Sequence, residues 1–294
     1  MKPTGTVAVT GVTGFVGNHV ARAFIAAGWR TIGLCRQPAR QAAVPGLEFR
    51  AFDLNAASTV DLSGATLLVH CALEPYRDAG GDAESINVRG SRRLFENALV
   101  QGVERMAFIS SIAAREGSSS DYGTDKLRIE RFLDLNRDIV VRPGLIVGDG
   151  GLFRAMYLAI RKRGIAPLFF GGRSPVYTVG IDDLTRALVE LVQNERHGLY
   201  VLAAPEPVSL KELYLQLARK CGVRVRLIPL PYAPVLFAVS LLERFGLTLP
   251  VSSGSIKGVA AMQQIEIPTY AGLDAEMRPL APLLEGLSIA ERRT

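Results

Sequence analysis

The chain has 294 residues, of which 48% are hydrophobic, and it carries a formal net charge of +6. This length and composition allow a large buried core, which excludes a disordered chain and fits one large α/β domain, or one domain with a small lobe. The basic residues are scattered, with no cluster larger than Arg161-Lys162-Arg163, so no nucleic-acid partner is expected.

Cysteine and histidine usage gives no sign of a disulfide framework or a metal site. Cys35, Cys71 and Cys221 lie far apart and form no C-x-x-C pair, and no histidine has a partner at metal-ligand spacing. A strand-like segment at Val7-Ala8-Val9 leaves no room before it for a signal peptide. We therefore predict no metal and a cytoplasmic location.

Through the first half of the chain, short apolar runs alternate with segments of helical periodicity. The runs that predict strands are Thr6–Thr10, Thr31–Cys35, Glu48–Phe52, Leu67–Cys71, Arg105–Ser110 and Ile139–Arg142. Such alternation is typical of parallel β-α-β units, and the fully apolar Leu67-Leu68-Val69 fits a strand that is covered on both faces. We therefore predict an α/β fold with a doubly wound parallel Rossmann sheet.

A glycine-rich turn follows the first predicted strand and opens a helix. Its sequence, Thr10-Gly-Val-Thr-Gly-Phe-Val-Gly17, has the spacing G-x-x-G-x-x-G. Glycines at this place let the backbone approach a pyrophosphate, whose charge is favoured by the N–H groups and dipole of the helix. Gly17 allows that helix to pack closely on the sheet. The turn therefore predicts a dinucleotide-binding site.

The ends of the second and third strands carry residues that select the nucleotide. An acid at the end of the second strand favours NAD, whereas an arginine accommodates the 2′-phosphate of NADP. This chain has Arg36 there, with Arg40 nearby in sequence, so we predict NADP(H), with NAD(H) as the alternative. Asp53, before Leu54, either reaches the adenine amino group or caps a helix.

In the second half of the chain, strand-like and helix-like segments alternate less regularly. Helices are expected near Leu152–Arg163, Leu184–Val192 and Leu210–Lys220, and strands at Val176–Val179 and Leu199–Ala203. We assign residues 1–150 to an NAD(P)-binding Rossmann domain and 151–294 mainly to a smaller C-terminal substrate lobe. Residues 175–205 are expected to return to the Rossmann domain.

The most apolar stretch, residues 227–251, is interrupted by three prolines and carries Glu243 and Arg244. These residues argue against a membrane-spanning helix. We expect an amphipathic helix from Pro234 to Gly246 instead. A further hypothesis is that this helix lies on a membrane surface and guards a lipophilic substrate, so peripheral membrane contact is left open while stable insertion is not expected.

A tyrosine and a lysine four residues apart, Tyr122 and Lys126, share one face of any helix that contains them. Just upstream, Ile109-Ser-Ser111 ends a predicted strand, where α/β sheets place residues that contact ligands. A phenol is a poor base at neutral pH, and a neighbouring ammonium favours its ionised form. The segment is therefore a candidate for contact with a ligand, with Tyr122 and Lys126 as a candidate pair.

The order of these motifs resembles the extended, epimerase/dehydratase-like short-chain dehydrogenases/reductases. The segments that carry the resemblance are T-G-x-T-G-F-x-G, Asp53-Leu54, His70-Cys-Ala72, Asn87-Val-Arg-Gly90, Ile109-Ser-Ser111, Tyr122 with Lys126, Arg142-Pro-Gly144 and Val176–Leu184. They span almost the whole chain. The chain departs from the pattern in the short interval between Ser111 and Tyr122, and in Leu73, which replaces a small residue.

The resemblance implies roles for individual residues. Tyr122 becomes the general acid/base, Lys126 binds the nicotinamide ribose and lowers the pKa of the tyrosine, and Ser111, or alternatively Ser110, hydrogen-bonds the reacting oxygen. The implied cofactor contacts are Gly11, Thr13, Gly14, Phe15, Val16, Gly17, Arg36, Asp53, Leu54, Cys71, Ala72, Leu73, Ser110, Tyr122, Lys126, Pro143, Gly144 and Leu145.

The function expected from these residues is hydride transfer between NADP(H) and a carbonyl or alcohol of a small organic or sugar-like substrate. Two alternatives stay open. One is a sugar or sugar-nucleotide epimerase or dehydratase that recycles its cofactor internally. The other is a non-catalytic NADP(H)-binding sensor or assembly protein, which the presence of Ser111, Tyr122 and Lys126 disfavours. The expected oligomeric state is a monomer or a homodimer.

Overall fold

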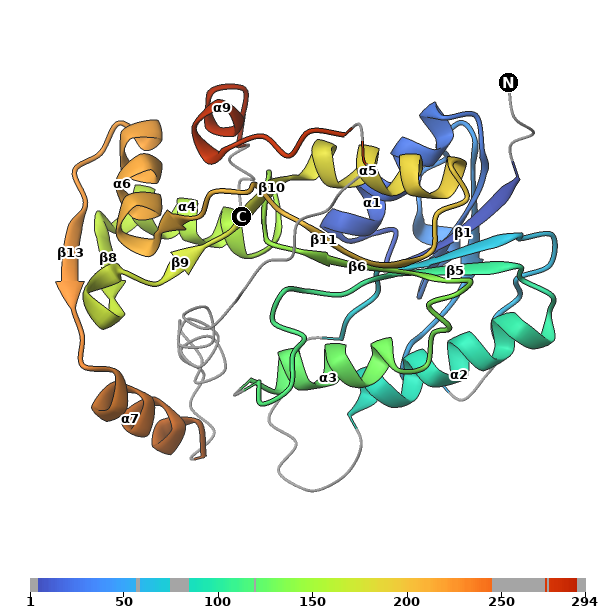
Figure 1. Ribbon diagram of the computed structural model, residues 1–294, viewed down its shortest axis with the longest axis horizontal. Coiled ribbons are helices and arrows are strands. Elements are labelled where there is room, and N and C mark those ends of the chain that lie inside the picture. The colour runs from blue at the N-terminus through green and yellow to red at the C-terminus, as the bar shows by residue number, and fades with distance from the viewer. Residues whose placement is uncertain are drawn as a thin grey trace.

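The structure, a computed structural model, describes residues 5–56, 59–74, 85–118, 120–244, 273 and 275–289, and the side chains at 241–244 are not described. Its main sheet consists of seven parallel strands (Figure 1). They are β1 (Thr6–Thr10), β2 (Arg30–Cys35), β3 (Leu47–Ala51), β4 (Leu67–His70), β5 (Arg105–Ile109), β6 (Ile139–Pro143) and β11 (Gly198–Leu202). The spatial order is β11-β6-β5-β4-β1-β2-β3. The order reverses between β1 and β4, which is the place where doubly wound sheets bind ligands.

Four helices cover the two faces of this sheet (Figure 1). They are α1 (Phe15–Ala26), α2 (Ile86–Val100), α3 (Asp121–Glu130) and α5 (Ile181–Gln193). Helices α1 and α5 share one apolar core with the sheet, and α2 and α3 share the core on the other face. The predicted doubly wound Rossmann fold is therefore confirmed, and the strand ends differ from the predicted ones by one residue at most.

The remaining elements form a smaller lobe with a core of its own. Its strands are β7 (Leu145–Val147), β8 (Ile165–Leu168), β9 (Pro175–Val176), β10 (Thr178–Gly180), β12 (Val208–Ser209) and β13 (Arg226–Pro229). They pair as β7 with β10, β9 with β12, and β8 with β13. The helices of the lobe are α4 (Gly151–Arg163), α6 (Leu210–Cys221), α7 (Tyr232–Arg244) and α9 (Leu280–Glu285), with the short 3₁₀ helix η2 (Phe169–Gly172) after β8. A second short 3₁₀ helix, η1 (Pro38–Arg40), lies between β2 and β3 of the main sheet.

The strand predicted at Val176–Val179 is split in two. Its first part pairs antiparallel with β12, whereas its second part pairs in parallel with β7. The change of partner falls at Tyr177, whose carbonyl accepts a hydrogen bond from the Leu145 N–H. The sequence pattern shows apolar residues across this point and gives no sign of the change of partner.

The segment from 175 to 205 contributes to the Rossmann layers, since β11 pairs with β6 and α5 packs on α1. The division of the chain at residue 150 remains a prediction.

The helix expected at Pro234–Gly246 begins two residues earlier, at Tyr232, and Gly246 lies outside the described residues. Pro234 is tolerated there because the first turn of a helix needs no N–H for internal hydrogen bonds.

Within the described ranges, no helix has both the length and the apolar composition needed to cross a bilayer.

Candidate active site

The carboxyl ends of β1, β2, β4 and β5 lie at one edge of the sheet because these strands run in parallel. Four groups of predicted site residues directly follow these strand ends. They are the glycine-rich turn 11–17, Arg36, residues 71–73, and Ser110 with Ser111. The topology thus brings together segments that are up to a hundred residues apart in the sequence.

The glycine-rich turn is held by contacts that a side chain would prevent. Gly11 has a φ of +66°, and a Cβ there would lie 3.0 Å from the Ala72 backbone. A Cβ at Gly17 would lie 2.3 Å from the Gly11 carbonyl oxygen, so α1 packs directly on the turn. Gly14 is the N-cap of α1; no side chain caps the helix, and its first turn has no acid. The N–H groups at this end are thus free to bind an anion, as a pyrophosphate requires.

The other predicted residues of the turn differ in exposure. Thr13 is exposed, Val16 packs against the core, and the ring of Phe15 fills the space that a Cβ at Gly148 or Gly150 would need. Phe15 therefore joins the turn to the loop after β7.

A buried polar network, which the sequence analysis did not identify, fixes the turn to the end of β4. The Thr10 hydroxyl oxygen accepts hydrogen bonds of 3.0 Å from the N–H groups of Cys71 and Ala72. Its proton is therefore available to His70 Nδ1 at 2.7 Å, which leaves Nε2–H to donate to Ser91 at 2.8 Å. Burial lowers the pKa of His70 to about 3, so this histidine is neutral and acts as a rigid link.

Arg36 lies at the end of β2, as expected, with 68% of its side chain exposed. Its guanidinium is 3.2 Å from the carboxylate of Glu74, which follows β4. Exposed ion pairs of this kind contribute little stability, so the guanidinium can exchange its partner for a phosphate. Arg40, in η1, is also exposed.

Asp53 does not cap a helix. Its carboxylate accepts the Asn55 N–H at 2.9 Å in a turn after β3, and the side chain is exposed. Leu54 is buried beside Gly90, where a Cβ would meet the Leu54 carbonyl oxygen. Leu73 is 40% exposed at the edge of the site.

Residues 143–145 connect β6 to β7 at the same edge of the sheet. A Cβ at Gly144 would lie 2.4 Å from the Tyr177 carbonyl oxygen, so this position requires glycine for close packing of the two segments.

Tyr122 and Ser111 meet at the beginning of α3. Ser120 caps this helix by accepting the Gly123 N–H, which places Tyr122 in the first turn. The Ser111 hydroxyl accepts the Ala113 N–H at 3.1 Å and hydrogen-bonds the Tyr122 hydroxyl. Burial raises the pKa of Tyr122, and the hydrogen bond with Ser111 partly opposes that rise.

Lys126 lies one turn further along α3 and is buried. Its ammonium donates to the Ile109 carbonyl at 2.7 Å, and it lies 4.5 Å from the ring centre of Phe108 and 5.8 Å from that of Tyr122. Burial lowers the pKa of Lys126 to about 8. Lys126 is thus held against Tyr122, although its ammonium is not among the groups that shift the pKa of that tyrosine in this structure.

Ser110 points to a different partner from that of Ser111. Its hydroxyl is buried and donates to the Glu130 carboxylate, which also forms a two-point ion pair with Arg142. Glu130 was missed by the sequence analysis, and Arg142 was named there only as part of the segment Arg142-Pro-Gly144. Glu130 could have been found from its position, because it follows Tyr122 and Lys126 at successive intervals of four residues on the same helix face.

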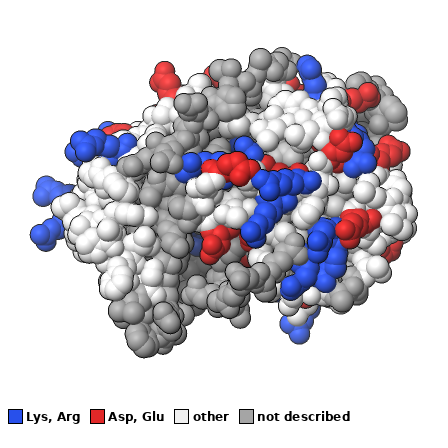
Figure 2. All heavy atoms as spheres, turned by 60° about the horizontal axis from the view of Figure 1, so that its bottom comes forward, with Lys and Arg blue, Asp and Glu red and all other residues white. Residues whose placement is uncertain are grey.

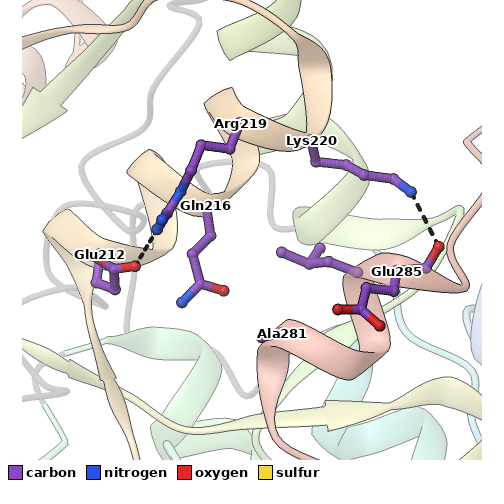
Figure 3. A pocket seen from close by; sticks show the side chains of 7 residues that line it. Glu212, Gln216, Arg219, Lys220, Ala281 and Glu285 are labelled. Atoms are coloured by element: carbon purple, nitrogen blue, oxygen red, sulfur yellow. Dashed lines mark hydrogen bonds and ion pairs between the residues drawn. The ribbon is translucent and has the colours of Figure 1, made fainter.

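A hollow of about 470 Å³ lies elsewhere, between α6 and α9, and Figure 3 shows Glu212, Gln216 and Glu285 at its rim. The Glu212 carboxylate is paired with Arg219 at 2.5 Å. Figure 1 shows both helices well away from α3. Because the hollow contains none of the residues that converge on Tyr122, we do not assign the reaction to it.

The comparisons agree with this geometry. The profile of the NAD dependent epimerase/dehydratase family matches residues 7–135. A ceramide reductase of Caulobacter vibrioides is 32% identical over 254 residues, which are 81% of this chain and 78% of the relative. A UDP-glucose 4-epimerase of Vibrio cholerae is 26% identical over 253 residues, covering 74% and 76%. A solved UDP-glucose 4-epimerase of Thermus thermophilus, in complex with NAD, superposes with a TM-score of 0.62 at 20% identity, covering 88% of this chain and 99% of that one.

The fold and the comparisons together define a dinucleotide-dependent enzyme of the Rossmann type. The chain belongs to the NAD dependent epimerase/dehydratase family and is an NAD(P)-dependent enzyme of that family. The predictions of family and enzyme class are therefore confirmed.

Proposed function

We propose that this enzyme transfers hydride between NADP(H) and a carbonyl or alcohol carbon of its substrate, with Tyr122 as the acid/base. The observation that carries the proposal is the convergence of Ser111 and Lys126 on Tyr122 after β5. In the sheet, β5 lies two strands from β1, which leads into the glycine-rich turn. Two strand spacings amount to about 10 Å, a distance that an extended dinucleotide can span.

The residues at the sheet edge fit such a cofactor. The uncapped start of α1 and the glycines of the turn would hold the pyrophosphate, and Arg36 would meet a 2′-phosphate. We assign Asp53 and Leu54 to the adenine side, and residues 71–73 and 143–145 to the nicotinamide side. When bound, the nicotinamide supplies or accepts the hydride.

In the reducing direction, a bound nicotinamide would supply the hydride for the carbonyl carbon, and Tyr122 would donate its proton to the carbonyl oxygen. The C=O group thereby becomes CH–OH, and Tyr122 is left as a phenolate. Tyr122 is protonated at neutral pH, as a free phenol is, and the direction in which burial shifts its pKa preserves that state. Ser111 donates a hydrogen bond to the reacting oxygen, and we assign the Lys126 ammonium to the nicotinamide ribose.

The relative from Caulobacter vibrioides supports a reaction that consumes the reduced cofactor, since it is named as a reductase. Its name also contains that of a lipid, ceramide, which widens the range of carbonyls to be tested from small organic or sugar-like ones to lipophilic ones. The relative from Vibrio cholerae supports the second candidate, an epimerase that recycles its cofactor internally.

A substrate screen followed through NADPH absorbance, with NADH in parallel, tests the proposal. The panel should contain sugar-like carbonyls, sugar nucleotides and long-chain lipid ketones. We expect stoichiometric loss of NADPH with a carbonyl substrate and slower loss of NADH. Conversion of a sugar nucleotide to its epimer with no net change in cofactor would overturn the redox assignment in favour of the epimerase.

A further inference from the structure

Helix α7 presents apolar residues without burying them. From Tyr232 to Ser240 its side chains are exposed or half-exposed, and Phe237 is 70% exposed. Every residue of this stretch except Ser240 is apolar. Only its first residue has aromatic contacts with the lobe among the described rings, where Tyr232 lies 4.9 Å from the ring of Phe170 and 6.4 Å from that of Phe169. An apolar helix left uncovered in this way indicates a binding surface.

Five basic residues gather at the beginning of β13, the strand that leads into α7. Arg161, Lys162 and Arg163 end α4 and are exposed, as are Arg224 and Arg226. The two groups are neighbours because β8 and β13 pair. The Arg226 N–H donates to the Gly164 carbonyl at 2.7 Å, and a Cβ at Gly164 would lie 3.1 Å from the Arg224 carbonyl oxygen.

This basic cluster, formed by residues 161–163, Arg224 and Arg226, has charge available for a partner. Of its members, Lys162, Arg163, Arg224 and Arg226 form no ion pair with a residue of the described chain. Ile165, which is 46% exposed, lies directly opposite Arg226 in the strand pair. Cationic and apolar groups are therefore mixed at the same surface.

The cluster and α7 belong to one end of the molecule. Figure 1 shows β13 and α7 at the outer end of the small lobe, away from the main sheet. Figure 2 shows, at that same end, basic side chains that protrude beside a broad uncharged surface. Only two residues separate the end of β13 from the start of α7.

We propose that this end of the lobe docks on an anionic lipid surface, with α7 in the interfacial layer and the basic cluster at the headgroups. Such a surface offers both an apolar phase for Phe237 and its neighbours and negative charge for the arginines and lysine. A second copy of this chain offers no comparable charge complementarity, because each copy carries a net charge of +6. Docking would place the lobe at the lipid–water boundary, and it does not depend on the presence of the enzyme's substrate.

Co-sedimentation with vesicles tests the docking surface. We expect binding to vesicles that contain phosphatidylglycerol, little binding to phosphatidylcholine alone, and loss of binding as salt is raised. The double variant Arg224→Gln/Arg226→Gln should weaken binding about 25-fold, at about five-fold for each charge removed. Phe237→Ser should weaken binding while leaving its salt dependence intact.

Two matched controls lie on the Rossmann domain. Arg22→Gln removes an exposed charge on α1, and Val100→Ser alters a residue that is 86% exposed at the end of α2. Both should bind vesicles like the unmodified protein, and all variants should keep the unmodified circular dichroism spectrum. Docking is refuted if the unmodified protein ignores anionic vesicles, if the controls lose binding equally, or if Phe237→Ser only dissociates a dimer in sedimentation velocity runs.

Discussion

At the scale of single residues, the relation between Tyr122 and Lys126 follows from their spacing on a helix, so the sequence predicts that they share a face. The choice between Ser110 and Ser111 does not follow from sequence, because both directly follow the same strand. The structure distinguishes the two serines by their partners. The Ser110 hydroxyl donates a hydrogen bond to the Glu130 carboxylate, whereas the Ser111 hydroxyl is hydrogen-bonded to Tyr122. The roles of Ser111, Tyr122 and Lys126 in catalysis remain predictions.

Lys126 offers a test that requires no substrate. Burial lowers its pKa from 10.5 to about 8, so its folded-state pKa lies below its unfolded-state pKa. The stability that belongs to the neutral form is present above pH 10.5 and is lost as the pH falls to about 8. The variant Lys126→Met has no titratable group at this position, so its stability does not change in this way with pH.

The free energy of unfolding of Lys126→Met, relative to that of the unmodified protein, should therefore rise by about 3 kcal/mol as the pH falls between these limits. Urea unfolding of the cofactor-free proteins at several pH values measures this difference. Lys162→Met, at an exposed position, should show no such trend. A pH-independent difference for Lys126→Met would contradict the burial of its charge.

At the scale of elements, the glycine-rich turn and α1 were predictable because Gly11 has a positive φ and Gly17 lies in close contact with the Gly11 carbonyl oxygen. The backbone at Gly14 has a φ of −88° and a ψ of 173°, which any residue can adopt, and a Cβ there would lie 3.2 Å from the Gly11 carbonyl oxygen. Gly14→Val should therefore fold. Its side chain would nevertheless occupy the place where the pyrophosphate is expected to meet the N–H groups of α1.

We expect Gly14→Val to weaken binding of NADPH by about 100-fold or more, which corresponds to at least about 2.7 kcal/mol. Calorimetry measures the affinity, and thermal unfolding measures the stability. Gly17→Ala is the contrasting variant: its Cβ would lie 2.3 Å from the Gly11 carbonyl oxygen, so it should lower the melting temperature markedly. Unchanged NADPH affinity in folded Gly14→Val would move the pyrophosphate elsewhere.

Features that depend on contacts between distant segments were harder to predict from the sequence. The change of strand partner at Tyr177 and the His70 network between Thr10 and Ser91 both join segments that are far apart in the chain. His70 belongs to a segment that the sequence analysis singled out. Only the structure shows that its ring is buried and links β1, β4 and α2.

At the scale of the whole molecule, the Rossmann layers followed from the alternation of apolar and helical segments, but the attachment of the small lobe did not. Asp183, at the start of α5, is fully buried and holds the guanidinium of Arg278, from a segment ninety-five residues further along the chain. Nothing in the local pattern around either residue predicts this pairing. The extent of the substrate lobe also remains a prediction, since local patterns do not define which layer a short strand joins.

The most direct measurement of the central claim is the turnover of Tyr122→Phe with a carbonyl substrate from the screen, together with its affinity for NADPH. The variant keeps the ring but lacks the proposed proton donor, so kcat should fall by about 10² to 10⁴-fold while NADPH binds with unchanged affinity. Tyr200→Phe, whose hydroxyl bonds only the His197 carbonyl among the described residues, is the matched control and should keep its rate. Turnover by Tyr122→Phe at the unmodified rate would contradict the assignment of Tyr122 as the acid/base.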